Sequence, residues 1–243
     1  CHSTASPIFS MRMVDTMRHT RQLKHNFVAT IESGVTTIRD MGAFSGLLRY
    51  FIRQIEDGSL PGPRVTYCNS ILNVMGGHPE IPPTDMNLFA KPMSLFIGMI
   101  MDNFRDTEEM EECLEKNARG ASFIKLSMDA QTLFCKKNKE IPVYTRDQLD
   151  RVFRFAEKKG LPVSGHIHYK SGFDRALEYP FNSVEHMVAD VVLTDEEVIR
   201  MADRKLAIVP TMTLSQSFLV DEAYDDLPPA YRTPEIQAER EAR

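Results

Sequence analysis

Short runs of β-branched and apolar residues alternate with longer segments of helical periodicity, and this alternation limits the fold more than any other feature of the chain. The first pattern is typical of buried strands and the second of amphipathic helices, and short connections between them indicate parallel βαβ units. We predict strands over 34–40, 64–69, 122–127, 162–168, 182–187 and 206–213. We predict helices over 11–32, 45–58, 106–120, 145–160, 171–179 and 194–205, with Ser45 and Thr145 as N-cap residues.

The reactive side chains lie in or at the ends of several different predicted strands. They are Asp40, Lys125, His166, His168 and His186, and the chain contains neither GxGxxG nor GxxxxGK[ST]. A doubly wound sheet usually concentrates its chemistry in one glycine-rich turn, whereas a barrel collects it from many strands at its carboxyl face. The sequence therefore predicts an α/β fold, a (β/α)8 TIM-type barrel, incomplete as given because the first and eighth strands are largely absent.

The domain organisation follows from what interrupts this alternation. No repeat, low-complexity tract or linker divides the chain, so we expect one partial barrel domain over residues 1–243. The longest interruption, 69–105, is predicted to be a functional loop over the site, because loops of this length are more often functional than not. The chain begins without an initiator methionine and stops inside a charged, helix-like run at 233–243, so we interpret it as an interior piece of a longer protein.

The composition excludes several classes of protein. The 243 residues are 42% hydrophobic and carry a net charge of −5, without a stripe of Lys and Arg that could neutralise nucleic-acid phosphates. The longest apolar stretch, 94–101, is too short to span a bilayer. Four cysteines form no CxxC pair and are predicted to be free thiols: Cys1, Cys68, Cys113 and Cys135. We expect no nucleic-acid or membrane partner and, by default, a cytoplasmic location; a homo-oligomer stays open.

Three histidines are predicted to meet at one edge of the barrel. His166 and His168 point to the same side of a strand because side chains alternate, and His186 ends the next strand along the chain. Three imidazole nitrogen atoms near one point suit a divalent transition metal. The alternative is that each histidine is a hydrogen-bonded residue at a strand end.

Lys125 lies in the middle of the apolar strand "FIKLS", where an unpaired ammonium would be costly to bury. It could extend its amine to solvent along the strand end. It could instead act as a Schiff-base nucleophile, or be held neutral by its surroundings and chemically modified.

Four segments of the chain resemble the amidohydrolase superfamily in order and spacing. They are "GVTTIRDMG", "FIKLS", "VSGHIHYKSGFDRALEYPFNSVEHM" and "IVPTM". The similarity is greatest to the imidazolonepropionase-like branch that includes Xaa-Pro dipeptidases with a carboxylated lysine. It extends to about residue 215, and 163–187 is its most specific part.

This resemblance implies a set of metal ligands. Lys125 would carry a CO2-derived carbamate that bridges two divalent metal ions, most simply Zn2+, with Mn2+, Co2+ and Fe2+ as alternatives, and His166 and His186 would bind the second metal. "CH" at 1–2 resembles the end of the family's HxH motif, which makes His2 a further ligand. A carbamate can bridge two dications about 3.5–4 Å apart, and such metals convert a bound water to hydroxide at neutral pH. The first histidine of HxH and the family's aspartate after the eighth strand are not in the sequence.

Other residues receive roles by the same resemblance or by position. His168 would lie behind the metal ligands or face the substrate. His78, in "MGGHPE", resembles the family's GGH loop and would contact substrate, or make only local bonds; Pro79 and Glu80 depart from the usual Gly and Asp. Arg39 and Asp40 are interpreted first as a structural ion pair and second as support for metal ligands.

The function predicted on these grounds is hydrolysis of an amide-type C–N bond in a small-molecule or short-peptide substrate, with Lys125, His168 and His78 at the reaction centre. Two alternatives stay open. One is a metal-free barrel lyase or aldolase in which Lys125 forms a Schiff base, and the other is an inactive barrel that serves as a binding subunit.

Overall fold

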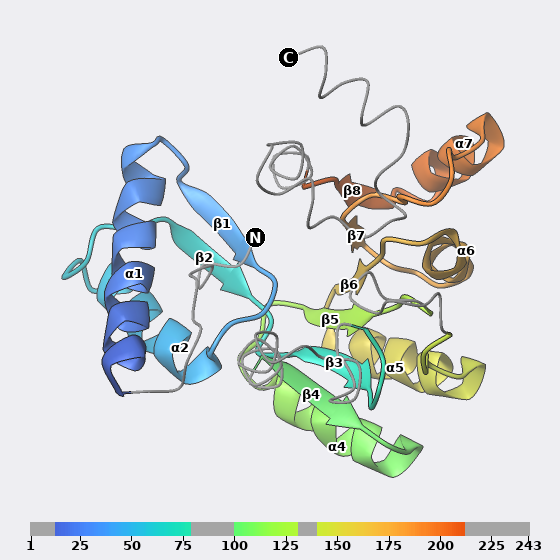
Figure 1. Cartoon of the computed structure of the whole chain (residues 1–243), viewed down its shortest axis with the longest axis horizontal. Coiled ribbons are helices and arrows are strands. Elements are labelled where there is room, and N and C mark those ends of the chain that lie inside the picture. The colour runs from blue at the N-terminus through green and yellow to red at the C-terminus, as the bar shows by residue number, and fades with distance from the viewer. Residues whose placement is uncertain (1–12, 79–99, 131–139, 212–243) are drawn as a thin grey trace.

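The computed structural model of the chain describes residues 13–78, 100–130 and 140–211 (Figure 1). Its larger sheet has six parallel strands in the order β4-β3-β5-β6-β7-β8. These strands are β3 (Ile71–Val74), β4 (Met101–Phe104), β5 (Ile124–Ser127), β6 (Val163–His166), β7 (Ser183–Glu185) and β8 (Ala207–Val209). The helices that connect them are α4 (Thr107–Ala118), α5 (Arg146–Lys159), α6 (Lys170–Glu178) and α7 (Asp195–Asp203).

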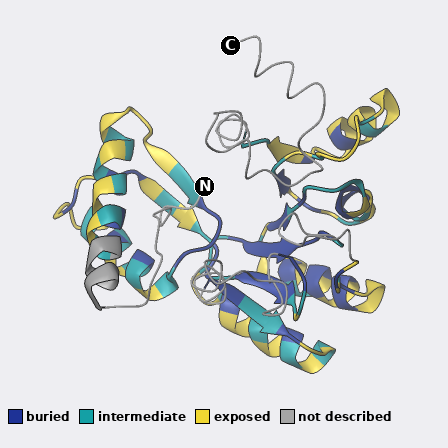
Figure 2. Cartoon of the chain, viewed as in Figure 1, coloured by how far each residue is buried: buried dark blue, intermediate teal, exposed yellow. Residues whose placement is uncertain are grey.

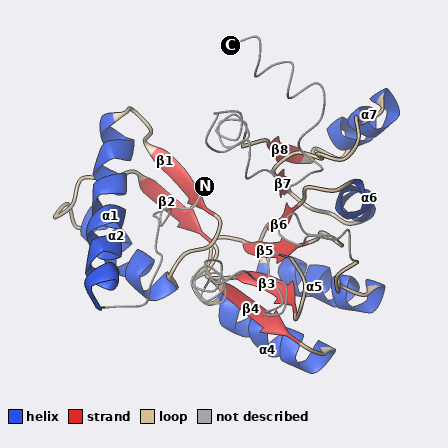
Figure 3. Cartoon of the chain, viewed as in Figure 1, coloured by secondary structure: helices blue, strands red, loops and turns tan. Residues whose placement is uncertain are grey.

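All four of these helices lie on one face of the curved sheet, as the outer helices of a barrel do (Figure 3). Alternation along the strands divides the residues between the two faces. Leu126 and Val184 belong to the main apolar core together with residues of the helices, and this core is buried (Figure 2). Lys125, Ser164 and Ser183 are paired in register and, being one residue out of phase with that core, occupy the opposite face. The inner face of this partial barrel is therefore polar.

The first part of the chain forms a second, smaller layer. Two parallel strands, β1 (Thr37–Asp40) and β2 (Arg64–Tyr67), pack with α1 (Met13–Glu32) and α2 (Ser45–Glu56) (Figure 1). The core between them includes Leu23, Phe27, Leu48 and Phe51. The Ser122 N–H donates to the Tyr67 carbonyl at 2.8 Å, which joins the end of β2 to the start of β5.

The structure confirms the alternating α/β fold and all six predicted strands, with small shifts in their ends. It adds two strands inside the segment that the sequence analysis treated as one long connection. Only three residues separate the end of β2 from the start of β3, and β4 contains Asp102 and Asn103, residue types that strands disfavour. Residues 79–99, the middle of that connection, lie outside the described ranges.

The predicted N-cap residues agree in part with the observed starts of the helices. Thr145 is the N-cap of α5 and forms a capping box with Gln148, as its position predicted. Ser45 is instead the first helical residue of α2, and Phe44 is the N-cap without a side-chain bond. The Asp40 carboxylate accepts the Gly42 N–H at 3.0 Å and closes the turn that precedes the helix. Across the described helices, none is long and apolar enough to cross a membrane.

Candidate functional site

The carboxyl ends of β5, β6 and β7 place their last residues side by side. Ser127 is paired in register with His166, and His166 with Glu185. His186 follows directly, and its N–H donates to the Val209 carbonyl at 2.8 Å. His186 has a φ of 76°, a left-handed conformation that costs energy for a residue with a side chain. Such strain persists where surrounding contacts impose it, commonly at functional sites.

Four imidazole rings gather at this edge. The ring centroids of His166 and His186 are 4.4 Å apart, those of His168 and His186 4.5 Å, and those of His78 and His166 4.5 Å. Ligand atoms of His166, His168 and His186 all lie within 4.8 Å of one another. The structure therefore brings together the three histidines that the sequence analysis grouped, and adds His78 to them.

Burial keeps the rings of His78, His166 and His168 neutral. It lowers the pKa of His78 to about 3 and that of His168 to about 4, and it lowers the pKa of His166 well below the ordinary range. A neutral imidazole has a free lone pair, which is the form that binds a metal ion. Within the described part of the chain, His166 Nε2 is buried and has no hydrogen-bond partner.

Lys125 lies deeper on the same inner face. The residue is 2% exposed, so its amine does not reach solvent, which excludes the surface-directed conformation considered above. Its Nζ has no hydrogen-bond partner among the described residues. Burial lowers the pKa of Lys125 to about 8, against the opposite effect of the nearby Glu185 carboxylate. A buried amine without a partner is the condition in which lysine becomes nucleophilic or open to modification.

The loop that carries His78 requires its glycines. Gly76 has a φ of 80°, and a Cβ on Gly77 would lie 2.7 Å from Asn73 Oδ1 and 2.8 Å from the Val74 carbonyl oxygen. The His78 carbonyl accepts a hydrogen bond from the Ser127 hydroxyl. His78 is only 2% exposed, so the loop places it inside the cluster and against His166.

Two carboxylates of the site were missed by sequence analysis. Asp129, 1% exposed, accepts hydrogen bonds from the His168 and Tyr169 N–H groups, and its Oδ2 lies 3.8 Å from His166 Nε2. Burial raises the pKa of Asp129 to about 7, although those backbone bonds lower it. Its spacing of four residues from Lys125 was the available signal, since even spacings along an extended chain share a side.

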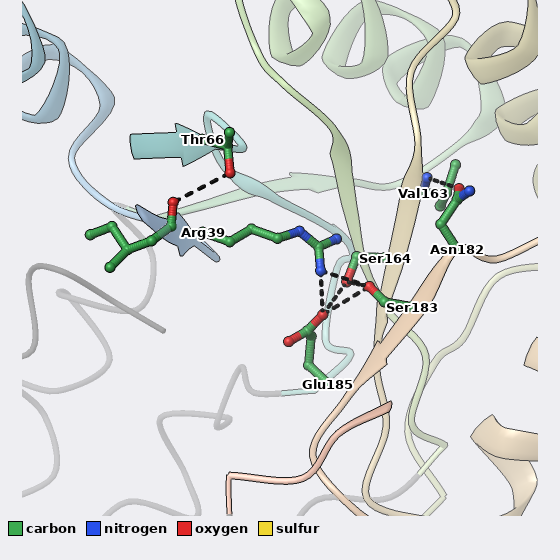
Figure 4. A network of polar contacts seen from close by, with 8 residues as sticks. Arg39, Thr66, Val163, Ser164, Asn182, Ser183 and Glu185 are labelled. Carbon is green, nitrogen blue, oxygen red and sulfur yellow. Dashed lines mark hydrogen bonds and ion pairs between the residues drawn. The ribbon is translucent and has the colours of Figure 1, made fainter. Parts of the chain in front are cut away.

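Glu185 is the second of these carboxylates, and it is held by a network that crosses the barrel interior (Figure 4). Its Oε1 accepts hydrogen bonds from Arg39 at 3.2 Å, Ser164 at 2.8 Å and Ser183 at 3.0 Å. Arg39 reaches it from β1 and also lies 4.4 Å from the centre of the Phe123 ring. Arg39 thus forms an ion pair with Glu185 of β7. Its pairing with Asp40 stays a prediction.

One predicted ligand cannot be placed, because His2 lies outside the described residues. The donors that are described fit a divalent transition metal. They are neutral imidazoles with a buried, unpartnered Nε2 at His166, beside a lysine whose nitrogen also lacks a partner among the described atoms.

Solved structures confirm the architecture. The Aspergillus niger ochratoxinase structure superposes with a TM-score of 0.68 at 18% identity, over 99% of this chain and 55% of that one. A Xaa-Pro dipeptidase with bound methionine in its active site gives 0.66 at 20% identity, over 98% of this chain and 55% of that one. In sequence, Aspergillus niger ochratoxinase is 24% identical over 208 residues, which are 78% of this chain and 40% of the relative. The chain therefore spans about half the length of these proteins.

The chain forms part of a parallel barrel, and its nitrogen donors gather at the carboxyl ends of the strands. These features are those of barrel proteins that bind a metal ion at that face. The amidohydrolase family model matches residues 19–227, and the chain belongs to that family. Its members act on small-molecule or peptide substrates and generally bind divalent metal ions. Among the residues that the structure describes, two side-chain groups could hold such an ion: His166–His168–His186 and the more deeply buried His78–Asp129–His166.

Proposed function

We propose that the protein is a metal-dependent hydrolase of amide-type C–N bonds, acting on a peptide or dipeptide bond in preference to a cyclic amide. One observation carries the proposal: buried nitrogen atoms without described partners, on Lys125 and His166, converge with two further imidazoles at the carboxyl ends of the strands. The similar proteins support the choice of bond, since they include ochratoxinase, a Xaa-Pro dipeptidase and molinate hydrolase.

The proposed ligands are His166, His186 and Lys125, with His2 as a further ligand outside the described residues. Bound divalent metals, most simply Zn2+, would supply an activated water and polarise the scissile carbonyl. The His186 ring is oriented by a contact of 2.9 Å between its Nδ1 and the Thr211 hydroxyl. Contacts of this kind fix the orientation of a metal-binding imidazole.

Lys125 is proposed to act as a carbamate. Its neutral amine adds to CO2 and releases one proton, which converts a buried cation into a two-oxygen anion. Burial lowers the pKa of Lys125 to about 8, which raises the fraction of neutral amine available to react near neutral pH. The product would also provide oxygen donors where the amine now has no described partner.

The remaining histidines are proposed to handle the substrate. His168 and His78 are neutral at physiological pH, because burial lowers the pKa values of both rings. A neutral imidazole offers one N–H donor and one acceptor. The two rings are therefore suited to orient the scissile amide and to exclude water from it.

The proposal is tested on intact protein expressed in metal-replete medium. Elemental analysis should find bound divalent metal, and Xaa-Pro dipeptides, N-acyl amino acids and cyclic amides should be screened for hydrolysis. A chelator should abolish any activity found, and Zn2+ should restore it. Protein that binds no metal under these conditions would contradict the proposal.

A second candidate uses Lys125 as a Schiff-base nucleophile without metal. Its buried, unpartnered amine favours this reading, but the four gathered imidazoles then have no role. Borohydride reduction in the presence of a carbonyl substrate would attach that substrate covalently to Lys125. We expect no such adduct, and its appearance would favour the lyase or aldolase reading. An inactive binding subunit would show neither bound metal nor activity, even in the wild-type protein.

A further inference from the structure

Asp129 connects two parts of the site that sequence reasoning treated separately. β5 ends at Ser127, and two residues later the Asp129 carboxylate is buried against the start of α6. Both of its oxygens accept from the His168 N–H, at 2.8 and 3.0 Å, and one also accepts from the Tyr169 N–H at 3.2 Å. α6 begins at Lys170, and its N-cap Tyr169 makes no side-chain cap bond of its own. A carboxylate from the neighbouring strand end thus accepts the N–H groups of the N-cap residue Tyr169 and of His168 before it, just ahead of the first turn of α6.

The same carboxylate faces the ring of His166. Asp129 Oδ2 lies 3.8 Å from His166 Nε2, beyond hydrogen-bond distance. The carboxylate therefore lies against both ends of the short segment 166–168, bonded to the His168 N–H and beside the His166 ring. Ile167, between them, is buried, and its N–H donates to the Glu185 carbonyl at 3.1 Å. The segment is held at each of its three residues.

Gly172 explains how the carboxylate fits. A Cβ on Gly172 would lie 2.8 Å from Asp129 Oδ1 and 3.2 Å from the Met128 carbonyl oxygen, so an alanine would require one of them to move. Glycine weakens the interior of a helix, and a helical glycine usually has a packing reason. Here the reason is the close approach of the Asp129 carboxylate to the first turn of α6.

We propose that Asp129 is a positioning residue: it fixes His166 and His168 relative to each other by binding the backbone at the start of α6, and Gly172 provides the space it needs. The consequence for metal binding rests on the proposed function. The competing role is that of a direct ligand, because Asp129, His78 and His166 also have ligand atoms within 4.8 Å of one another.

Four variants of the intact protein separate these roles. Asp129→Ala removes the carboxylate, and Gly172→Ala displaces it without touching it chemically. Asp129→Asn keeps one oxygen that can accept the backbone N–H groups but is a poor metal ligand. Gly46→Ala is the matched control, since Gly46 lies in α2 with nothing within 4 Å of an added Cβ.

The first measurement is the dissociation constant for Zn2+ by competition with a chelator. Asp129→Ala and Gly172→Ala should each weaken binding by about 10–100-fold, the usual effect of losing a group that orients ligands. Asp129→Asn should recover most of that loss, and Gly46→Ala should match the wild type. An asparagine variant as weak as the alanine variant would identify Asp129 as a ligand and overturn the positioning role. Wild-type affinity in both Asp129→Ala and Gly172→Ala would overturn it as well.

The second measurement does not depend on metal. Amide hydrogen exchange of the metal-free protein should become faster at His168 and Tyr169 in Asp129→Ala and Gly172→Ala, and should stay unchanged in Gly46→Ala. Unchanged exchange would refute the positioning role even if the protein binds zinc. If the wild-type protein binds no zinc but the variants show the expected change in exchange, the proposed function is refuted and the positioning role is not. If Asp129→Ala does not fold, Gly172→Ala and Asp129→Asn still decide between the outcomes.

Discussion

Two groups of polar side chains share the inner face of β5, β6 and β7, and they differ in how far their hydrogen-bonding capacity is used. The first, which we name the glutamate network, consists of Arg39, Ser164, Ser183 and Glu185. Glu185 Oε1 accepts three hydrogen bonds in it. The second, the histidine–lysine centre, consists of His78, Lys125, His166, His168 and His186. It contains the two buried nitrogen atoms that have no partner among the described residues.

The contrast is sharpest within one row of the sheet. Lys125 is paired in register with Ser164, and Ser164 with Ser183. The two serines bond to each other at 3.1 Å and to Glu185, whereas the lysine amine beside them bonds to nothing described. Folding alone favours satisfied buried groups, because an unsatisfied one costs about 1–3 kcal/mol. The glutamate network has the satisfied polar groups that a stable fold favours. The histidine–lysine centre keeps unsatisfied nitrogen atoms, which lower stability but are available for binding.

The largest effect is expected from Lys125→Met, which replaces the amine by an apolar chain of similar length. Metal content and turnover of the intact protein should fall by orders of magnitude, because the proposed bridge is lost. The metal-free protein should become more stable, by about 1–3 kcal/mol, because a buried unsatisfied group is removed. Elemental analysis, kinetics and denaturant unfolding measure the three quantities. Full metal content and activity in this variant would refute the carbamate.

The two histidines of "GHIH" should differ in a second experiment. His166→Ala should lose metal and activity together, since a direct ligand is removed. His168→Ala should keep most of its metal and lose about 10–100-fold in activity or affinity, as expected for a residue that orients the substrate or the ligands without binding the metal. Metal content and kinetic constants of both variants decide this. The reverse pattern would exchange the two roles.

The histidine–lysine centre should make the stability of the protein depend on pH. Burial lowers the pKa of His78 from 6.5 to about 3 and that of His168 from 6.5 to about 4. At pH values between the unfolded-state and folded-state pKa values, the unfolded chain binds more protons than the folded one. The free energy of unfolding should therefore fall as the pH falls from about 6.5 to about 4. The expected slope is about 1.4 kcal/mol per pH unit for each additional proton bound by the unfolded chain.

Asp129 acts in the opposite sense, because burial raises its pKa from 3.8 to about 7 and offsets one proton over much of that range. Since burial also lowers the pKa of His166, three histidines oppose one carboxylate and the net effect stays destabilising. Urea unfolding of the metal-free protein at several pH values measures it. His168→Gln should reduce the slope; an identical slope in that variant would contradict the assignment.

The last prediction concerns the glutamate network and changes only the stability of the protein. Arg39→Met leaves Glu185 buried without its ion pair, and removing one partner of a buried pair costs about 3–5 kcal/mol. We expect about 3 kcal/mol, because Ser164 and Ser183 still donate to Glu185 and the Arg39 side chain is 32% exposed.

The matched control for this variant is Arg105→Met, which breaks a solvent-exposed pair with Glu109 and should leave the free energy of unfolding almost unchanged. Denaturant unfolding of the metal-free proteins gives both values. Arg39→Met and Lys125→Met change similar side chains and should have opposite signs. The same sign for both would remove the distinction between the two groups of residues.

The sequence was sufficient for six of the eight described strands and for the grouping of His166, His168 and His186. Strand alternation and helical periodicity are local properties, so the segments around Lys125, His166 and His186 could be assigned without a structure. Parallel strands bring their carboxyl ends to one edge, which is why these histidines could be expected to meet. β3 and β4 were missed because one follows β2 almost directly and the other contains Asp102 and Asn103.

Only the tertiary structure decided which side chains are satisfied. Arg39 and Glu185 are 146 positions apart in sequence, and Asp129 and His168 are 39 apart. Such contacts depend on how strands are ordered and how far each side chain reaches, and no local pattern encodes either. For the same reason the sequence identified Lys125 as unusual but did not exclude an amine that reaches solvent. The structure shows that packing buries it. The local pattern thus determined which residues are available for chemistry, and long-range packing decided which of them the fold leaves without a partner among the residues that the structure describes.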